Sequence, residues 1–239
     1  HAERLAELGK IVGAVAHEIR NPLGVMLAHA KLLERSGADD EAVAGLRVEI
    51  ARARRFLDDL LRYGKPRPLA LERRRVLEIV ESAAIGAASG MGVPRADVAI
   101  EGDAALEADV DADALTDVVT ALVSNALIAT SALDAGSPRV TVRARRDLER
   151  AEIAVEDRGP GVPREIEPRL FEPFVTGRGR DAEHPGTGLG LAIAARWAAR
   201  HGGSLRHERP ATGARFVFEW PVAATVAGPS EPRETREPA

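Results

Sequence analysis

The sequence predicts an α+β protein in which a helical hairpin precedes an α/β sandwich. Apolar residues recur at three- and four-residue steps through residues 5–60, the periodicity of helices with one buried stripe. Strands that alternate polar and apolar residues come only later, mixed with helices. Residues 64–68, Gly-Lys-Pro-Arg-Pro, separate the halves as a linker, because proline cannot continue a helix.

The first half contains two amphipathic helical stripes. One runs from Leu5 to Leu33 and the other from Val43 to Leu60, with a short polar segment at 36–40 that suits a hairpin loop. Two helices of this length cannot cover both of their own apolar stripes, so pairing with a second copy into a four-helix bundle is expected. We therefore expect residues 1–63 to form a dimerisation hairpin and the chain to be a homodimer.

The second half alternates helices and strands in the order of an α+β sandwich. The pattern predicts helices at 73–88, 112–133 and 189–200, and strands at 98–100, 106–110, 139–145, 151–157, 204–207 and 214–220. This places a second domain at 69–221. Residues 222–239 are mostly Pro, Glu, Arg, Ser and Ala without periodicity, which predicts a disordered tail.

Composition excludes several classes of protein. The 239 residues have a formal charge of −4, which does not suit a dedicated nucleic-acid binder. The absence of cysteine excludes disulfides and thiolate zinc sites, and no lysine after Lys65 excludes a P-loop. No uncharged apolar run reaches about 18 residues, so we expect no membrane contact by this fragment and a cytoplasmic location. The chain begins at His1 without a signal pattern, which indicates a piece of a longer protein, and a membrane anchor in that parent is compatible with the sequence.

One histidine on the first helix has the position of a nucleophile. His17 falls roughly opposite the apolar stripe and is expected to face water, where a neutral imidazole is a competent nucleophile. Glu18 could take its proton, and Asn21 lies one helical turn on, near the same face. Most exposed histidines on amphipathic helices are only surface residues, so this pattern alone leaves both interpretations open.

Three further features suit a bound nucleotide, each with a plainer alternative. The glycines at 186–190 precede a helix, where backbone amides favour an anion, although such segments are equally often flexible turns. Asp157 ends a strand, and Gly159 and Gly161 leave room for a flat ring, although an aspartate also commonly starts a turn. Asn125 lies mid-helix among apolar residues, and its amide oxygen suits a hard ion such as Mg²⁺.

Taken in order, the motifs closely resemble the catalytic core of bacterial sensor histidine kinases. They are His17-Glu18-Ile19-Arg20-Asn21-Pro22, Asn125, Asp157-Arg158-Gly159-Pro160-Gly161, Phe171-Glu172-Pro173-Phe174 and Gly186-Thr187-Gly188-Leu189-Gly190-Leu191. The resemblance covers about Leu5 to Pro221. It implies a dimerisation and phosphoacceptor hairpin followed by a Bergerat-type (GHKL) ATP-binding domain, with ATP and Mg²⁺ as cofactors and a response regulator receiver domain as partner.

The same resemblance implies a role for each matching residue. His17 is the residue phosphorylated, Glu18 its general base, and Asn21 the residue that orients water for removing phosphate from the partner. Asn125 holds magnesium, and Asp157 accepts a hydrogen bond from the adenine amino group. The other implied nucleotide-binding residues are the pocket glycines Gly159 and Gly161, the lid anchors Phe171 and Phe174, the lid cation Arg178, and the phosphate-binding segment of Gly186, Thr187, Gly188, Leu189 and Gly190. The lid spans roughly 160–185.

Two departures from the family pattern keep other functions in view. Ala121 stands where a second asparagine is common, and Arg178 replaces the usual lysine. We predict a kinase that phosphorylates His17 from Mg·ATP, passes the phosphoryl group to a response-regulator aspartate, and also acts as the regulator's phosphatase. The alternatives are a phosphatase-dominant member, a nucleotide-binding signalling scaffold, and an ATPase of the wider superfamily, which the histidine helix disfavours.

Overall fold

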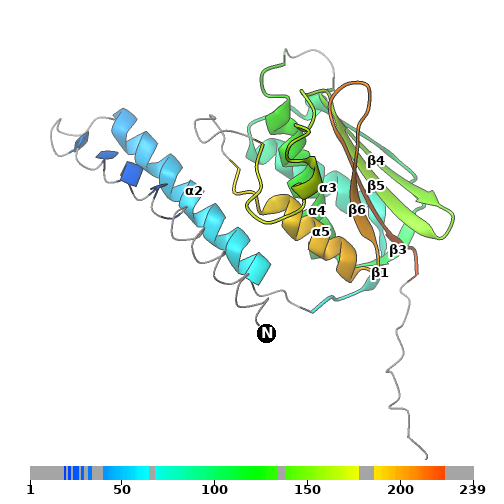
Figure 1. The fold of residues 1–239 in the computed structure, drawn as a ribbon. Coiled ribbons are helices and arrows are strands. Elements are labelled where there is room, and N and C mark those ends of the chain that lie inside the picture. Colours follow the sequence, from blue (N-terminus) through cyan, green and yellow to red (C-terminus); the bar gives the residue numbers. More distant parts are fainter. Residues whose placement is uncertain are drawn as a thin grey trace, which may run out of the picture. The chain divides into compact units, whose positions relative to one another are not determined.

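The structure, a computed structural model, describes residues 40–64, 68–133, 138–177 and 186–223, together with single residues and short runs between 19 and 33 (Figure 1). These residues divide into two compact units. Unit 1 takes its described residues from 1–67 and Pro168–Ile193, and unit 2 from Pro68–Glu167 and Ala194–Ala239. The predicted tail after 223 lies outside the described residues. Each unit is described by itself below.

Unit 1 contains the helical half of the chain. Helix α2 spans Asp40–Gly64, and the described residues between 19 and 33 are also helical. A Cβ atom at Gly45 would overlap the imidazole of His29, so the first helix approaches α2 closely at this glycine. The two predicted helical stripes are thus confirmed wherever the structure describes them.

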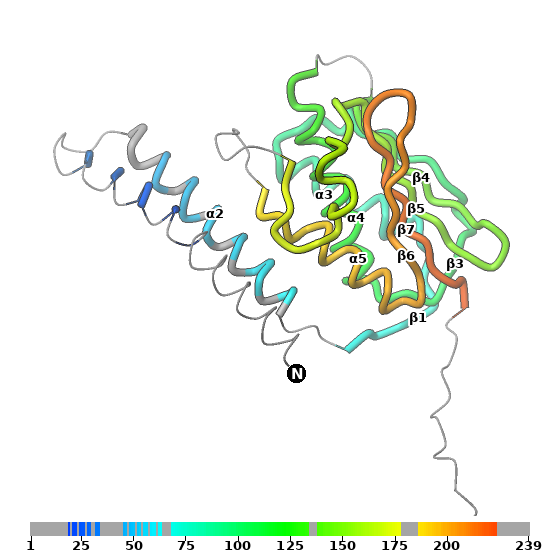
Figure 2. The backbone as a smooth tube through the Cα atoms, in the orientation of Figure 1, coloured from blue at the N-terminus to red at the C-terminus, as the bar shows by residue number. Residues whose placement is uncertain are grey.

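Unit 2 is built on a five-stranded mixed sheet in the order β2-β4-β5-β7-β6 (Figures 1 and 2). Strands β2 and β4 are parallel, and the remaining neighbours are antiparallel. The strands are β2 Val98–Gly102, β4 Val140–Asp147, β5 Arg150–Asp157, β6 Ser204–Glu208 and β7 Arg215–Pro221. All five predicted strands of this sheet are present, which confirms the α+β class.

Helices α3 (Val76–Gly90) and α4 (Ala112–Ala129) pack against each other and against the sheet. The core contains Leu115 and Leu122 of α4, Ile153 of β5, and the stacked rings of Phe218 and Trp220, all at most 1% exposed. Short 3₁₀ turns lie at Arg95–Asp97 and Glu167–Arg169, and helix α5 spans Gly190–Arg200. This core holds β5 in place, and the candidate site lies at the end of this strand.

Helix α4 is the one helix of the described residues that is long and apolar enough to cross a membrane, by length and composition alone. It carries Asp113 and Asp117, and its apolar side is buried in the core of unit 2. The helix was predicted to reach Leu133, but it ends at Ala129. The Thr130 hydroxyl donates a 2.9 Å hydrogen bond to the Ala126 carbonyl and caps the last turn.

The N-terminal end of α4 is tied to the end of α5 inside unit 2. The Asp111 carboxylate caps α4 by accepting from the Ala114 amide at 3.0 Å, and it also accepts from the Ala70 amide at 2.8 Å. The Asp111 amide in turn donates to Nε2 of His201 at 3.2 Å. The other ring nitrogen of His201 lies 2.7 Å from the Trp197 carbonyl, so the buried imidazole is neutral with its proton on Nδ1.

One element was predicted wrongly. The helix expected from Arg73 begins only at Val76, and Glu72–Arg75 form strand β1, paired antiparallel with β3 (Glu107–Val110). All four residues of β1 are exposed, so the strand has no apolar alternation to reveal it. It is held by ladder hydrogen bonds and by charge pairs such as Arg73 with Asp109.

Candidate functional site

Asp157 lies at the end of β5, the central strand of the sheet in unit 2. It is 4% exposed because β5 is buried through Val155 and the chain folds back over it. Its Oδ1 accepts hydrogen bonds from the Gly159 amide at 2.8 Å and the Ala214 amide at 3.3 Å. Its own amide donates to the Ala214 carbonyl at 2.9 Å. The carboxylate is therefore fixed by the loop that follows it and by the start of β7.

The glycines after Asp157 are required by the protein's own backbone. A Cβ at Gly159 would lie 2.8 Å from the Ala129 carbonyl oxygen, at the end of α4. Gly161 has φ +79°, and a Cβ there would lie 2.8 Å from the carbonyl of Gly213, itself a glycine with φ +78°. A Cβ at Gly213 would overlap the carbonyl oxygen of Asp157. The loop is thus pressed between α4 and the β6–β7 connection.

Asn125 lies on the half-buried side of α4, whose other side forms the core. Ala121 lies one turn before it and Ala129 one turn after it, on the same face of the helix. Because Ala129 approaches Gly159, the structure brings the Asn125 face of α4 to the loop that begins at Asp157. Unit 2 therefore gathers four of the predicted site residues: Asn125, Asp157, Gly159 and Gly161.

Among the described residues, no group of three or more histidine, aspartate or glutamate side chains could hold a metal ion by itself. The Asn125 amide supplies one neutral oxygen. Mg²⁺ usually takes few protein ligands and fills its octahedron with water and substrate phosphate oxygens. One amide oxygen at this position therefore fits a magnesium ion that arrives with a phosphate ligand.

The predicted lid anchors and the glycine segment belong to unit 1. The amide of Phe174 donates a 2.9 Å hydrogen bond to the Gly188 carbonyl. Phe174 has φ +66°, a conformation that is costly for an aromatic residue, and Gly188 has φ +69°. A Cβ at Gly188 would lie 2.6 Å from the carbonyl carbon of Phe174, so the two backbones are clasped tightly.

Thr187 connects the glycine segment to the helical hairpin within unit 1. Its hydroxyl donates to Oδ2 of Asp59 on α2 at 3.1 Å, and the Thr187 hydroxyl oxygen accepts from the Leu189 amide at 3.2 Å. Leu189 is fully buried and directly precedes α5. Sequence analysis missed Asp59, because the two residues are 128 positions apart and no local pattern links them.

The remaining predicted residues are placed as follows. Phe171 is half-buried, and Gly186 and Gly190 are respectively exposed and half-buried at the two ends of the glycine segment. Asn21 is exposed on a helix, as expected. His17, Glu18 and Arg178 lie outside the described residues.

The sequence matches two family models. Residues 7–69 match the His Kinase A (phospho-acceptor) domain, and residues 110–224 match the histidine kinase-, DNA gyrase B-, and HSP90-like ATPase. His17 and Asn21 lie in the first match, and Asn125 and Asp157 lie in the second. Both halves of the predicted core are therefore recognised independently.

Curated relatives match most of the chain. The signal transduction histidine-protein kinase AtoS of Escherichia coli (strain K12) is 30% identical over 92% of this chain and 36% of its own length. The sensory histidine kinase/phosphatase NtrB of Rhodobacter capsulatus is 32% identical over 87% of this chain and 61% of its own. The sensor-like histidine kinase SenX3 of Mycobacterium tuberculosis is 32% identical over 95% of this chain and 57% of its own. The chain thus spans less than two thirds of each.

Solved structures show the same fold. Histidine kinase ThkA, crystallised in complex with response regulator protein TrrA, gives a TM-score of 0.73 at 23% identity and covers 92% of this chain and 64% of that one. Full-length ShkA in complex with AMPPNP gives 0.60 at 26% identity over 93% of this chain and 46% of that one. The chain belongs to the sensor histidine kinases, which are ATP-dependent, and contains their catalytic core.

Proposed function

We propose that this core phosphorylates its own His17 from ATP and passes the phosphoryl group to an aspartate of a response regulator receiver domain. The observation that carries the proposal is the presence, on one chain, of a phosphoacceptor match around His17 and an ATPase match around Asp157. A nucleotide domain alone would fit many ATPases. A histidine helix beside it favours transfer to protein over release to water.

The reaction follows from the chemistry of the residues. A ring nitrogen of His17 attacks the γ-phosphorus of ATP, the bond from that phosphorus to the bridging oxygen breaks, and ADP leaves. Glu18 accepts the proton of the other ring nitrogen, as a general base. The Asp157 carboxylate accepts a hydrogen bond from the adenine amino group, and the backbone amides before α5 bind the phosphates. Mg²⁺ held by Asn125 would neutralise phosphate charge.

The comparisons support the choice of nucleotide and partner. ShkA was solved with AMPPNP, an analogue of ATP, and ThkA was solved with a response regulator. Asn125 and Asp157 lie on neighbouring elements of unit 2, as adenine and phosphate contacts on one nucleotide require. We take Mg·ATP and a receiver domain as the ligands.

The domain organisation belongs to the same proposal. Residues 1–63 would dimerise, 64–68 would link, and 69–221 would bind ATP in the cytoplasm. Several aliphatic side chains of the described hairpin residues are exposed and suit burial against a second copy: Val25, Leu32, Val48 and Ile50, at 38%, 52%, 61% and 41%. Sedimentation of the chain, with Val48→Glu as the disrupting variant, would test the homodimer.

A phosphatase activity toward the regulator is the second candidate. Asn21 is exposed on its helix, one turn after His17, where it could orient a water against a docked phosphoaspartate. The relative NtrB carries both activities in its name. The Asn21→Ala variant should retain labelling by ATP and lose the acceleration of regulator dephosphorylation. Equal dephosphorylation by both proteins would reject this role.

The kinase proposal is tested by incubation with γ-labelled ATP and Mg²⁺. The wild type should acquire an acid-labile, alkali-stable label that a purified receiver domain removes, and His17→Gln should bind nucleotide without labelling. Nucleotide binding without labelling of the wild type would favour the signalling scaffold. Steady phosphate release without labelling would favour an ATPase of the wider superfamily.

A further inference from the structure

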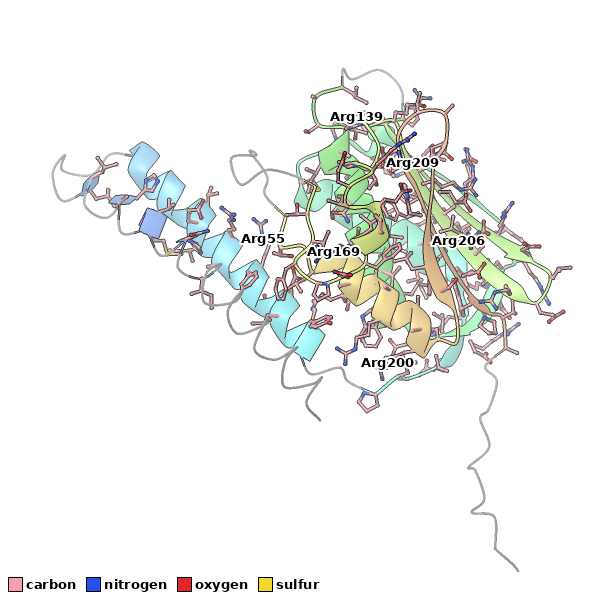
Figure 3. All side chains as sticks on the ribbon, viewed as in Figure 1. Arg55, Arg139, Arg169, Arg200, Arg206 and Arg209 are labelled. Atoms are coloured by element: carbon pink, nitrogen blue, oxygen red, sulfur yellow. The ribbon has the colours of Figure 1, made fainter. Side chains whose placement is uncertain are left out.

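The start of the predicted lid is bound to the β6–β7 hairpin through a three-residue ionic cluster in unit 2. Oε1 of Glu167 lies 3.0 Å from Nδ1 of His207. Oε2 of Glu167 accepts from Nε and from one terminal nitrogen of Arg209, at 3.1 and 2.6 Å. His207 lies on β6 and Arg209 directly follows it, and Figure 3 labels Arg209 beyond the end of the strand. Both carboxylate oxygens are therefore engaged from the hairpin.

The same cluster holds the turn that precedes Glu167. In addition to its bonds to Glu167, Arg209 donates a 2.8 Å hydrogen bond to the carbonyl of Val162. The turn itself contains a 3.3 Å hydrogen bond from the Ile166 amide to the Pro163 carbonyl. The hairpin also meets the preceding loop where Gly213 approaches Gly161. The whole segment from Asp157 to Glu167 is thus fixed along its length to the β6–β7 hairpin.

The imidazole of His207 is buried and depends on its contact with Glu167. Its side chain is only 5% exposed, it lies 5.3 Å from the ring of Phe216, and its Nε2 has no hydrogen-bond partner among the described residues. A buried imidazole with one unsatisfied nitrogen is costly unless its other nitrogen makes a strong bond. The bond to Glu167 is the contact that compensates it.

Glu167 is also the last residue of unit 2 before the chain enters unit 1 at Pro168. We propose that Glu167, held by His207 and Arg209, is a positioning residue that anchors the base of the lid and keeps the Asp157–Gly161 loop in its nucleotide-binding shape. The proposal rests on ATP being the ligand of the Asp157 site. It assigns the first part of the predicted lid of 160–185, up to residue 167, to a fixed base that belongs to unit 2.

The test measures ATP binding by Glu167→Ala, Arg209→Ala and the double variant, and compares it with variants of an ion pair in another part of the sheet. Arg143 and Glu101 form an exposed ion pair of 2.9 Å on β4 and β2, and their alanine variants serve as controls. Each anchor variant should weaken ATP binding about three- to tenfold and raise KM with little change in kcat. The double variant should be no weaker than either single one, because both remove one cluster.

Hydrogen exchange of the nucleotide-free proteins supplies the second measurement. Amides of residues 162–167 should exchange faster in the anchor variants than in the wild type, with unchanged exchange in β5 and only a small fall in melting temperature. Faster exchange combined with no ATP binding by the wild type would reject the proposed function and keep the anchor. Normal ATP binding and normal exchange in Glu167→Ala would overturn the anchor, as would equal effects in the Arg143 and Glu101 variants.

Discussion

The hydroxyl of Thr187 donates a 3.1 Å hydrogen bond to Oδ2 of Asp59, which joins the glycine segment before α5 to helix α2 of the hairpin. In the nucleotide-bound state proposed above, this segment surrounds phosphate oxygens. A carboxylate beside it disfavours an anionic ligand and occupies a hydroxyl that the ligand could use. We therefore expect Asp59 to oppose nucleotide binding in the conformation that the structure shows.

Replacing Asp59 tests this relationship. The Asp59→Asn variant removes the charge, and we expect it to bind Mg·ATP about three- to tenfold more tightly, since both groups are partly accessible and the effect is screened by water. Titration with a fluorescent ATP analogue measures it. Asp58→Asn is the control, because Asp58 is exposed on the same helix. Equal affinities for the two variants would show that the contact has no influence on binding.

A side chain at Gly188 would disrupt the backbone contact between Gly188 and Phe174. In Gly188→Ala the new Cβ would lie 2.6 Å from Phe174 at a φ of +69°. Relief requires the clasp with Phe174 to open, so we expect ATP affinity to fall about tenfold or more with a small change in melting temperature. The measurement is the same titration.

Gly86→Ala provides the matched control for that substitution. Gly86 lies inside α3, and no atom lies within 4 Å of the Cβ position. Alanine there should stabilise unit 2 by about 0.5–1 kcal/mol without changing ATP affinity. A Gly188→Ala protein that bound ATP as well as Gly86→Ala would contradict the importance of the clasp.

Asp157 should determine both affinity and base preference. In Asp157→Asn the amide oxygen can still accept from Gly159 and Ala214, which turns the amide nitrogen toward the adenine amino group. The amide nitrogen and the adenine amino group are then both donors and cannot form a hydrogen bond with each other. We therefore expect ATP affinity to fall about a hundredfold. Competition between ATP and GTP measures the loss of selectivity. Asp111→Ala should instead cost about 1 kcal/mol of stability through its helix cap and leave base selectivity intact.

The Glu167 anchor has a definite pH dependence. The hydrogen bond from Arg209 lowers the pKa of Glu167 below its ordinary value of 4.5, against an opposing effect of desolvation, and the Arg209 charge and His207 add to the lowering. A depressed carboxyl pKa stabilises the fold above the unfolded value and loses this contribution as pH falls through the folded value. The contacts should therefore persist at neutral pH and weaken only in acid.

Hydrogen exchange at 162–167, corrected for intrinsic rates and followed from about pH 3 to 7, tests this direction. Protection should fall on the acidic side of 4.5 in the wild type and should be low and nearly pH-independent in Glu167→Gln. Protection lost already near neutrality would contradict a carboxylate-based anchor.

Local patterns predicted what local interactions determine. The buried strand that ends at Asp157 and the glycines after it were identifiable because alternation and glycine placement are properties of neighbouring residues. Strand β1 was not predicted, because Glu72–Arg75 is exposed on both faces and has the composition of a charged helix start. The end of α4 was placed too late because the capping role of Thr130 is visible only in its geometry.

Contacts between distant residues could not be predicted in the same way. Asp59 and Thr187 are 128 positions apart, and Glu167 and Arg209 are 42 apart. Acidic and basic residues are abundant in this chain, so nothing in the sequence singles out these pairs. Their pairing is set by the packing of helices and strands that the sequence specifies only collectively.

Mapping the phosphorylated residue decides whether His17 receives the phosphoryl group of ATP. After incubation with Mg·ATP, peptides prepared at alkaline pH are sequenced by mass spectrometry. The chain has six histidines, and the five other than His17 serve as internal controls. We expect phosphohistidine at position 17 alone. Phosphate on another histidine, or on a serine, threonine or aspartate of the chain with position 17 unmodified, would contradict it.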